Sequence, residues 1–193
     1  MRIARRENYT SRAAGLQQSL GALAAMATHR WPVCGAGCPS DIAQNCHRNC
    51  PDVPVALSDA PEEYPLETVI APLVYEMRRL DGIYPCWSCE GHERFGDLWK
   101  LPQVWFYAKR QIHVRVLSDV LTAANLKGGL DVEWEVVVTY SDSDNPETTY
   151  ALRPKQNQMD LSLKALQADV QSLAAGVVEL CQARAKALQN QGA

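Results

Sequence analysis

The sequence predicts an α+β fold: a small, mostly antiparallel sheet layered with helices, with an N-terminal cysteine-rich unit and a long C-terminal helix. Three observations support this prediction. Helical and strand-like segments alternate as helix, strand, strand, helix, strand, strand through residues 66–154. A turn-rich stretch separates the last two strand-like segments, as in a hairpin. Apolar residues then recur at intervals of four and three near the C-terminus.

The 193 residues fit one domain with extensions better than two full domains. Composition and periodicity divide the chain into five parts. They are an N-terminal helix (1–32), a cysteine-rich metal-binding unit (33–51), a Pro-rich linker (52–65), the α+β core (66–154) and a long C-terminal helix that could form a coiled coil (155–193).

Composition argues against several classes of protein. The net charge is −3 and the pI is about 5.8, whereas a general nucleic-acid binder presents a basic face. No stretch approaches the roughly 18 apolar residues that a membrane-spanning helix needs, so we expect no membrane partner. No motif identifies a small-molecule ligand.

Three helices are expected before the C-terminal one, at residues 9–29, 66–80 and 111–126. In each segment apolar residues recur at helical spacing. Pro72 either kinks the second helix or starts a shorter one, because proline fits the first turn of a helix but not its interior. Gly128-Gly129 ends the third helix.

Four strands are expected, at residues 83–88, 103–108, 131–140 and 148–153. The last two form a hairpin around the turn-forming residues 142–146. Pro85 makes the first strand an edge strand, because proline cannot donate a hydrogen bond to a neighbour. Residues 93–101 are expected to form a polar loop.

The C-terminal segment, residues 158–189, is predicted to be one long helix with a heptad seam over residues 159–180. Two interpretations fit this seam equally well. It either packs against its own domain or the N-terminal helix, or it joins a homodimer or a partner protein. Cys181 lies next to the seam and is expected to be a buried thiol. The apolar seam residues are Met159, Leu163, Leu166, Val170, Leu173, Val177 and Leu180.

Four cysteines lie close together in the cysteine-rich unit: Cys34, Cys38, Cys46 and Cys50. The first pair lies in a Gly-rich turn, and the second is spaced to share one face of a short helix. Four such thiolates could surround one tetrahedral zinc ion. An iron–sulfur cluster also accepts four thiolates. Nested disulfides, Cys34 with Cys50 and Cys38 with Cys46, are a third possibility.

The cellular compartment decides between metal and disulfides. Paired cysteines form disulfides where conditions are oxidising and hold metal where they are reducing. The short apolar stretch at residues 19–27 follows a long polar region, which is atypical of a secretory signal. We therefore expect a cytoplasmic protein, with an exported, disulfide-bonded protein as the alternative.

The densest group of reactive side chains contains Cys86, Cys89, Glu90 and His92. In one interpretation Cys86, Cys89 and His92 are zinc ligands, with His113, His29 or a water as the fourth. An open fourth position would permit hydrolytic or deamination chemistry, with Glu90 transferring protons. In a second, Cys89 is a nucleophile whose thiolate is favoured by His92. In a third, the motif has a structural role only.

Strand geometry limits which of these side chains can lie on the same face. Side chains alternate across a strand, so Cys86 points away from Cys89 if the chain stays extended. Only a tight turn after Trp87 lets Cys86 and Cys89 bind one ion, and Gly91 predicts such a turn one or two residues later. Cys89 and His92 are therefore the central pair, with Glu90 secondary.

The run Ser88-Cys89-Glu90-Gly91-His92 lies between a short strand and an aromatic one, Val104-Trp105-Phe106-Tyr107. In this respect residues 66–126 resemble a group of small uncharacterised bacterial and phage proteins with a Ser-Cys-(Glu/Ser)-Gly-His turn between two strands. The resemblance implies that Cys89, Glu90, Gly91 and His92 form one unit. It brings no established activity, and Cys86 and the N-terminal cysteines depart from the group.

These observations predict a metal-binding protein, with zinc as the metal, of an accessory or interaction type. Two other classes of function stay open. One is a metal- or thiol-dependent enzyme that acts on a small molecule through Cys89 and His92. The other is an iron–sulfur or thiol redox sensor.

Overall fold

The structure, a computed structural model, describes residues 9–25, 66–140, 148–156 and 161–191. The predicted cysteine-rich unit at residues 33–51, with Cys34, Cys38, Cys46 and Cys50, lies outside the described residues, as does the linker at 52–65.

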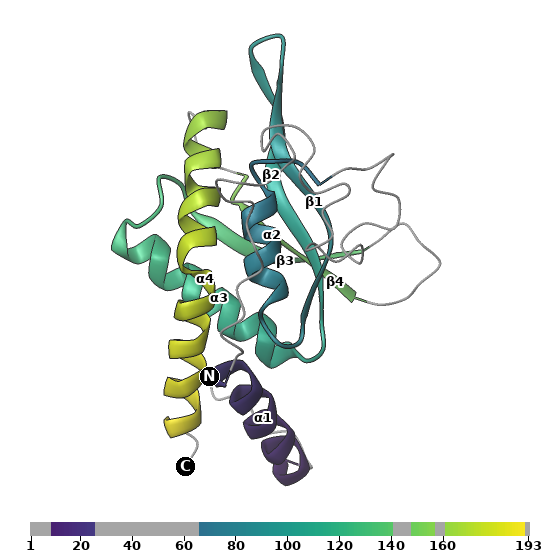
Figure 1. The fold of residues 1–193 in the computed structure, drawn as a ribbon, viewed down its shortest axis with the longest axis vertical. Coiled ribbons are helices and arrows are strands. Elements are labelled where there is room, and N and C mark those ends of the chain that lie inside the picture. Colours follow the sequence, from purple (N-terminus) through teal and green to yellow (C-terminus); the bar gives the residue numbers. More distant parts are fainter. Residues whose placement is uncertain (1–8, 26–65, 141–147, 157–160, 192–193) are drawn as a thin grey trace, which may run out of the picture.

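Among the described residues, four antiparallel strands form one sheet in the order β1-β2-β4-β3 (Figure 1). Strands β1 and β3 therefore lie at its two edges. This arrangement confirms the predicted α+β fold, the edge position of the strand with Pro85 and the hairpin near the end of the core. The strands are β1 (Ile83–Arg94), β2 (Asp97–Ala108), β3 (Trp134–Tyr140) and β4 (Thr148–Pro154).

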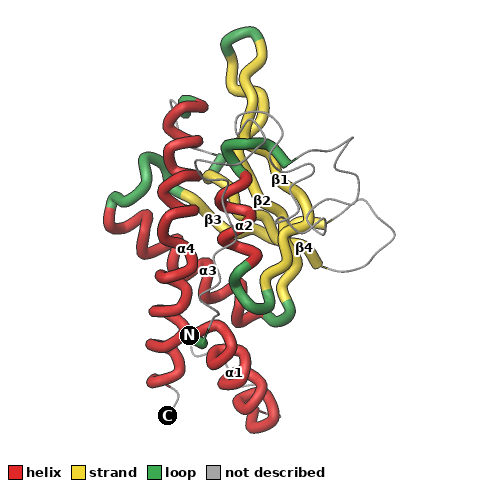
Figure 2. The backbone as a smooth tube through the Cα atoms, viewed as in Figure 1, coloured by secondary structure: helices red, strands yellow, loops and turns green. Residues whose placement is uncertain are grey.

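In the part of the chain that the structure describes, four helices accompany the sheet (Figure 2). Helices α2 and α4 pack against β1, α4 also reaches β2, and α3 packs against β2 and β3, while α1 packs against α3 and α4. None of these helices is long and apolar enough to cross a membrane. Their bounds are α1 (Tyr9–Ala24), α2 (Ala71–Arg78), α3 (Gln111–Lys127) and α4 (Leu163–Gln191).

The core lies between the helices and the sheet. It explains the apolar periodicity of the sequence, because the helical stripes and alternate strand residues all point into this layer. Its largest fully buried side chains come from α1, the α2 region, α3 and all four strands: Leu20, Leu23, Ile70, Leu73, Met77, Leu80, Ile83, Phe106, Leu117, Leu121, Trp134 and Leu152.

Helix α2 is shorter than the predicted 66–80. Pro72 lies in its first turn, so the helix begins at Ala71 and the residues before it form a turn. Pro72 therefore starts a shorter helix and does not kink a longer one, which was one of the two outcomes expected for it. Glu67 consequently lies outside the helix.

The prediction of a polar loop at residues 93–101 is wrong. Strands β1 and β2 continue through this region as one long hairpin, which projects beyond the rest of the sheet (Figure 1). The chain reverses at Phe95 and Gly96, both with positive φ (56° and 90°). The polar residues that suggested a loop are instead exposed strand residues.

The heptad seam of α4 packs within its own chain. Leu166, Val170, Leu173 and Val177 are buried in the core, whereas Leu180 is half exposed. Cys181 is buried, as expected. Intrachain packing therefore accounts for most of the described seam.

One buried carboxylate ties α4 to the segment that enters β3. Asp169 is 2% exposed. It accepts hydrogen bonds from the backbone N–H groups of Asp131 (2.7 Å) and Val132 (3.1 Å) and from the indole Nε1 of Trp134 (2.9 Å). These three hydrogen bonds offset the desolvation cost of burying the Asp169 carboxylate.

We expect Asp169→Ala to lower the free energy of unfolding by about 3 kcal/mol or more, because three N–H donors lose their acceptor. Chemical denaturation measures this loss. Asp131→Asn is the matched control, since the Asp131 side chain is exposed, and it should change stability by less than about 0.5 kcal/mol. Equal losses in the two variants would contradict the anchoring role of Asp169.

A buried histidine lies where the chain passes from α2 to β1. His113 of α3 is 1% exposed, and its Nδ1 lies 2.9 Å from the carbonyl oxygen of Arg110. A carbonyl only accepts, so Nδ1 carries the proton. Nε2 faces Gly82, where an added Cβ would lie 2.4 Å away, and it has no hydrogen-bond partner among the described residues.

Burial lowers the pKa of His113, and the hydrogen bond to Arg110 and the charge of Asp81 only partly oppose this. Because the folded pKa lies below the unfolded value of 6.5, the unfolded chain binds more protons between the two values. We therefore expect the free energy of unfolding to fall as pH drops below about 6.5. His113→Gln should lessen this dependence. Denaturation curves at pH 5, 6 and 7 test it, and identical pH slopes would refute it.

Candidate metal centre

Three potential metal ligands lie close together at the edge strand β1. Two belong to the strand, and the third comes from the segment before α2. The ligand atoms of Glu67, Cys89 and His92 all lie within 4.8 Å of one another. Oε1 of Glu67 is 2.9 Å from Nε2 of His92. Cys89 is 3% exposed, whereas the other two side chains are partly exposed. We call Glu67, Cys89 and His92 the triad. The triad could hold a metal ion.

The backbone of β1 positions the triad through an exchange of hydrogen bonds with the turn before α2. The Glu90 N–H points away from β2 and donates to Oε2 of Glu67 at 2.6 Å. The Glu90 carboxylate in turn accepts from the Val69 N–H at 2.8 Å. Each carboxylate thus binds a backbone N–H of the other segment, which fixes Glu67 beside the strand.

Two glutamines of α4 hold both segments from the helix side. Nε2 of Gln167 donates to the Glu90 carbonyl at 3.2 Å, and Nε2 of Gln171 donates to the Val69 carbonyl at 2.8 Å. Residues four apart on a helix share a face, so one face of α4 contacts both β1 and the turn. Such supporting contacts hold potential ligands in a fixed arrangement.

The turn predicted near Gly91 is not formed, since β1 continues as a strand to Arg94. In a regular strand, Cys89 and His92 would point to opposite faces. Gly91 has φ +84°, a conformation that interrupts the alternation and that glycine adopts without strain. The glycine therefore has a role at the site, but as a twist within a strand instead of a turn.

The other predicted site residues contribute no ligand atom to the triad. Cys86 is exposed at a shift in the β1–β2 register between Pro85 and Trp87, and it contributes no atom to the triad. The carboxylate of Glu90 is bonded to the Val69 N–H, so its contact is structural. The four cysteines of the N-terminal unit are outside the described residues.

Burial is the main influence on the pKa of the Cys89 thiol, and neighbouring groups act on that pKa in both directions. Burial raises the pKa of Cys89, and the carboxylates of Glu67 and Glu90 add to this effect. A hydrogen bond from the Gly91 backbone and the Lys100 ammonium act to lower the same pKa. Because the net pKa is raised, the thiol form predominates at neutral pH, which disfavours Cys89 as a free nucleophile.

Sequence reasoning did not identify Glu67. The residue lies 22 positions before Cys89, in a segment that reads as the first turn of an amphipathic helix. The only local signal was Pro72, which permits a helix start at Ala71 and leaves Glu67 outside it. The contact itself depends on how α2 packs beside β1, and no local pattern encodes that.

We expect Gly91→Ala to destabilise the chain more than Gly96→Ala. Both glycines have positive φ, and forcing a Cβ there costs about 1–2 kcal/mol. At Gly91 the new Cβ would also lie 2.8 Å from Leu163 and 2.9 Å from Pro102, whereas nothing lies within 4 Å at Gly96. Overpacking should add about 1–3 kcal/mol. Thermal and chemical denaturation measure the difference, and equal effects would contradict the close packing at Gly91.

Comparison with known proteins assigns no family. No family model matches the chain, and no curated protein matches it. The chain is weakly similar to the solved structure of the PH1069 protein from Pyrococcus horikoshii, at 14% identity and a TM-score of 0.30, over 69% of this chain and 89% of that one. Because this TM-score is low, the similarity carries no inference about fold or function.

Proposed function

We propose that this chain is a zinc-binding protein of accessory or interaction type, and that the triad Glu67, Cys89 and His92 holds the ion. The observation that supports this best is the meeting of one thiol, one imidazole and one carboxylate within 4.8 Å. Two of them come from β1 and the third from a distant segment, so their meeting depends on the fold.

The mixed donor set favours zinc. Zinc accepts sulfur, nitrogen and oxygen ligands together in a tetrahedral arrangement. Calcium and magnesium prefer oxygen ligands alone. An ion at this position would also place positive charge beside a thiol whose pKa is otherwise raised, and a coordinating thiol is deprotonated.

Three protein ligands leave a fourth position for water or for a group from a partner. The partial exposure of Glu67 and His92 makes that position reachable from outside. The Val69 N–H ties one carboxylate oxygen of Glu90 to the turn before α2, which gives Glu90 a structural contact and disfavours it as the proton-transfer group of the enzyme hypothesis. For this reason we place the accessory role ahead of a hydrolytic one, in which a zinc-bound water would act as the nucleophile.

The cysteine-rich unit stays a second proposed site. Cys34, Cys38, Cys46 and Cys50 would bind their own zinc ion, or alternatively an iron–sulfur cluster. Any metal measurement on the whole chain must therefore compare variants, because the total content sums both sites.

We expect Cys89→Ser and His92→Ala each to lose about one zinc per chain relative to the unchanged protein, because either change removes one of only three ligands. The measurement is elemental analysis of protein purified without chelators. Cys86→Ser is the matched control, since it removes a thiol from the same strand outside the triad, and it should keep its zinc.

Cobalt substitution gives a second readout. The cobalt-loaded protein should show a thiolate charge-transfer band, which Cys89→Ser should abolish and Cys86→Ser should preserve. The proposal fails if Cys86→Ser and Cys89→Ser lose equal amounts of metal, or if neither loses any. A brown protein with a visible absorption band would indicate iron–sulfur in place of zinc.

A further inference from the structure

The long hairpin of β1 and β2 (Figure 1) carries a lysine next to the triad. Lys100 of β2 lies directly opposite His92 of β1 in the strand register, and its side chain is exposed. Opposite residues in an antiparallel pair project from the same face, with Cβ atoms about 4.5–5.5 Å apart. The ammonium group of Lys100 can therefore reach a group bound beside His92.

An irregularity in β2 gathers two cations around one indole ring. The register shifts between His92 and Glu93, so Trp99 of β2 has no partner in β1. Such a bulge interrupts the alternation of side chains, which allows the neighbours Trp99 and Lys100 to touch. Nζ of Lys100 lies 4.5 Å from the centre of the Trp99 ring, and the guanidinium carbon of Arg94 lies 6.0 Å from it. Cation–π attraction thus holds both cations on this part of the hairpin.

These two cations lack a carboxylate partner. Within the described part of the chain, neither Lys100 nor Arg94 forms an ion pair, whereas other cations such as Arg153 and Lys155 do. The charge of Lys100 acts on the triad, because it works to lower the pKa of Cys89 although burial keeps that pKa raised. A positive charge without an ion-pair partner therefore lies close to the three potential ligands.

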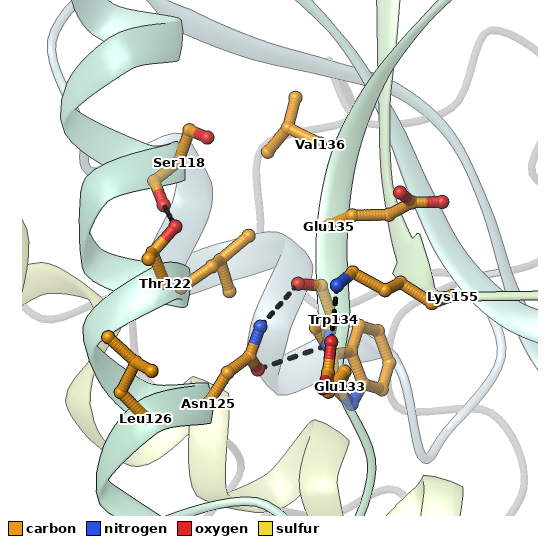
Figure 3. A pocket seen from close by; sticks show the side chains of 10 residues that line it. Ser118, Thr122, Asn125, Leu126, Glu133, Trp134, Glu135, Val136 and Lys155 are labelled. Atoms are coloured by element: carbon orange, nitrogen blue, oxygen red, sulfur yellow. Dashed lines mark hydrogen bonds and ion pairs between the residues drawn. The ribbon is translucent and has the colours of Figure 1, made fainter. Parts of the chain in front are cut away.

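A cavity of about 250 Å³ between α3 and β3 lacks this feature (Figure 3). The charged side chains that line it are already paired within the chain, Glu133 with Lys155 and Glu135 with Arg153. A ligand in this cavity would have to compete with those ion pairs. A ligand at the triad would instead meet Lys100, whose charge has no partner among the described residues.

We propose that the fourth position of the metal centre takes an oxyanion, a carboxylate or phosphate group of the ligand, and that Lys100 binds the same group. The proposal rests on the zinc site proposed for the triad. Zinc accepts oxygen ligands, and the partial exposure of Glu67 and His92 leaves the fourth position open to a ligand from outside. The ammonium group then holds the oxyanion by a charge-assisted hydrogen bond.

The charges of the site make the bound anion depend on Lys100. With zinc in place, the Glu67 carboxylate and the Cys89 thiolate cancel the two positive charges of the ion. An anion added to this neutral centre depends on nearby cations for further electrostatic attraction. Lys100 supplies one such charge and Arg94 a second. The Glu90 carboxylate opposes them, but a backbone N–H already binds it. A neutral ligand at the same position gains nothing from Lys100.

The test is anion titration of the cobalt-loaded full chain, freed of excess cobalt, with perchlorate to keep the ionic strength constant. Acetate and inorganic phosphate are the probes, and the visible cobalt spectrum reports a change of ligand. We expect at least one probe to bind, and Lys100→Met to weaken that binding about fivefold, because one nearby charge is lost. The probe that binds more tightly identifies the class of ligand. Four thiolates fill a tetrahedral site, so cobalt in the cysteine-rich unit adds only a constant background.

Imidazole is the neutral probe for the same open position, because at about pH 8 most of it carries no charge. Lys100→Met should leave its affinity unchanged. Lys127→Met, which removes an exposed lysine at the end of α3, is the matched control and should keep both anion and imidazole binding. Lys100→Arg keeps the charge and should keep anion affinity within about twofold. Circular dichroism checks that the three variants are folded.

Failure of the zinc site and failure of the oxyanion site give different results. If Cys89→Ser retains as much cobalt as the unchanged chain, the zinc site is refuted and the oxyanion site falls with it. If cobalt binds through Cys89 but neither anion changes the spectrum, or Lys100→Met binds both anions as tightly as before, only the oxyanion site is refuted. A Lys100→Met variant that loses cobalt or imidazole affinity also refutes it, since Lys100 then shapes the site instead of binding an anion.

Discussion

The buried carboxylate of Asp169 sets the position of α4, and the rest of the core depends on that helix. Asp169 accepts from three donors at the entrance to β3. Two residues before and after it, Gln167 and Gln171 reach the opposite edge of the sheet at β1 and the turn before α2. On a helix, positions 167 and 171 share a face while position 169 lies on the other side. One short stretch of α4 therefore holds both edges of the sheet.

Most of the secondary structure could be predicted from the sequence, because its signals are local. The helix at 111–126, the hairpin of β3 and β4 and the edge position of the Pro85 strand depend on periodicity, turn residues and a missing donor. The 93–101 region could not be predicted in this way. Its polar composition suits both a loop and the exposed end of a long hairpin, and only pairing with the other strand decides between them.

The candidate metal centre was predictable only in part. Cys89 and His92 stand out because reactive residues cluster there in the sequence. Glu67 does not, because a single glutamate near the start of an apolar helix is commonplace. Its role comes from its contact with the Glu90 N–H, which depends on tertiary packing. Gly91 correctly indicated an unusual backbone conformation at this position, but the sequence could not distinguish a turn from a twist within a strand.

The spacing within α4 constrains how this protein can vary in length. An α-helix advances about 100° per residue, so one inserted residue between Gln167 and Gln171 would turn the following side chains away from their partners. Contacts to β1 and contacts to the entrance of β3 could not then form together. Insertions and deletions among relatives of this chain should accordingly avoid this stretch, while the exposed turn at Phe95 and Gly96 could accommodate them.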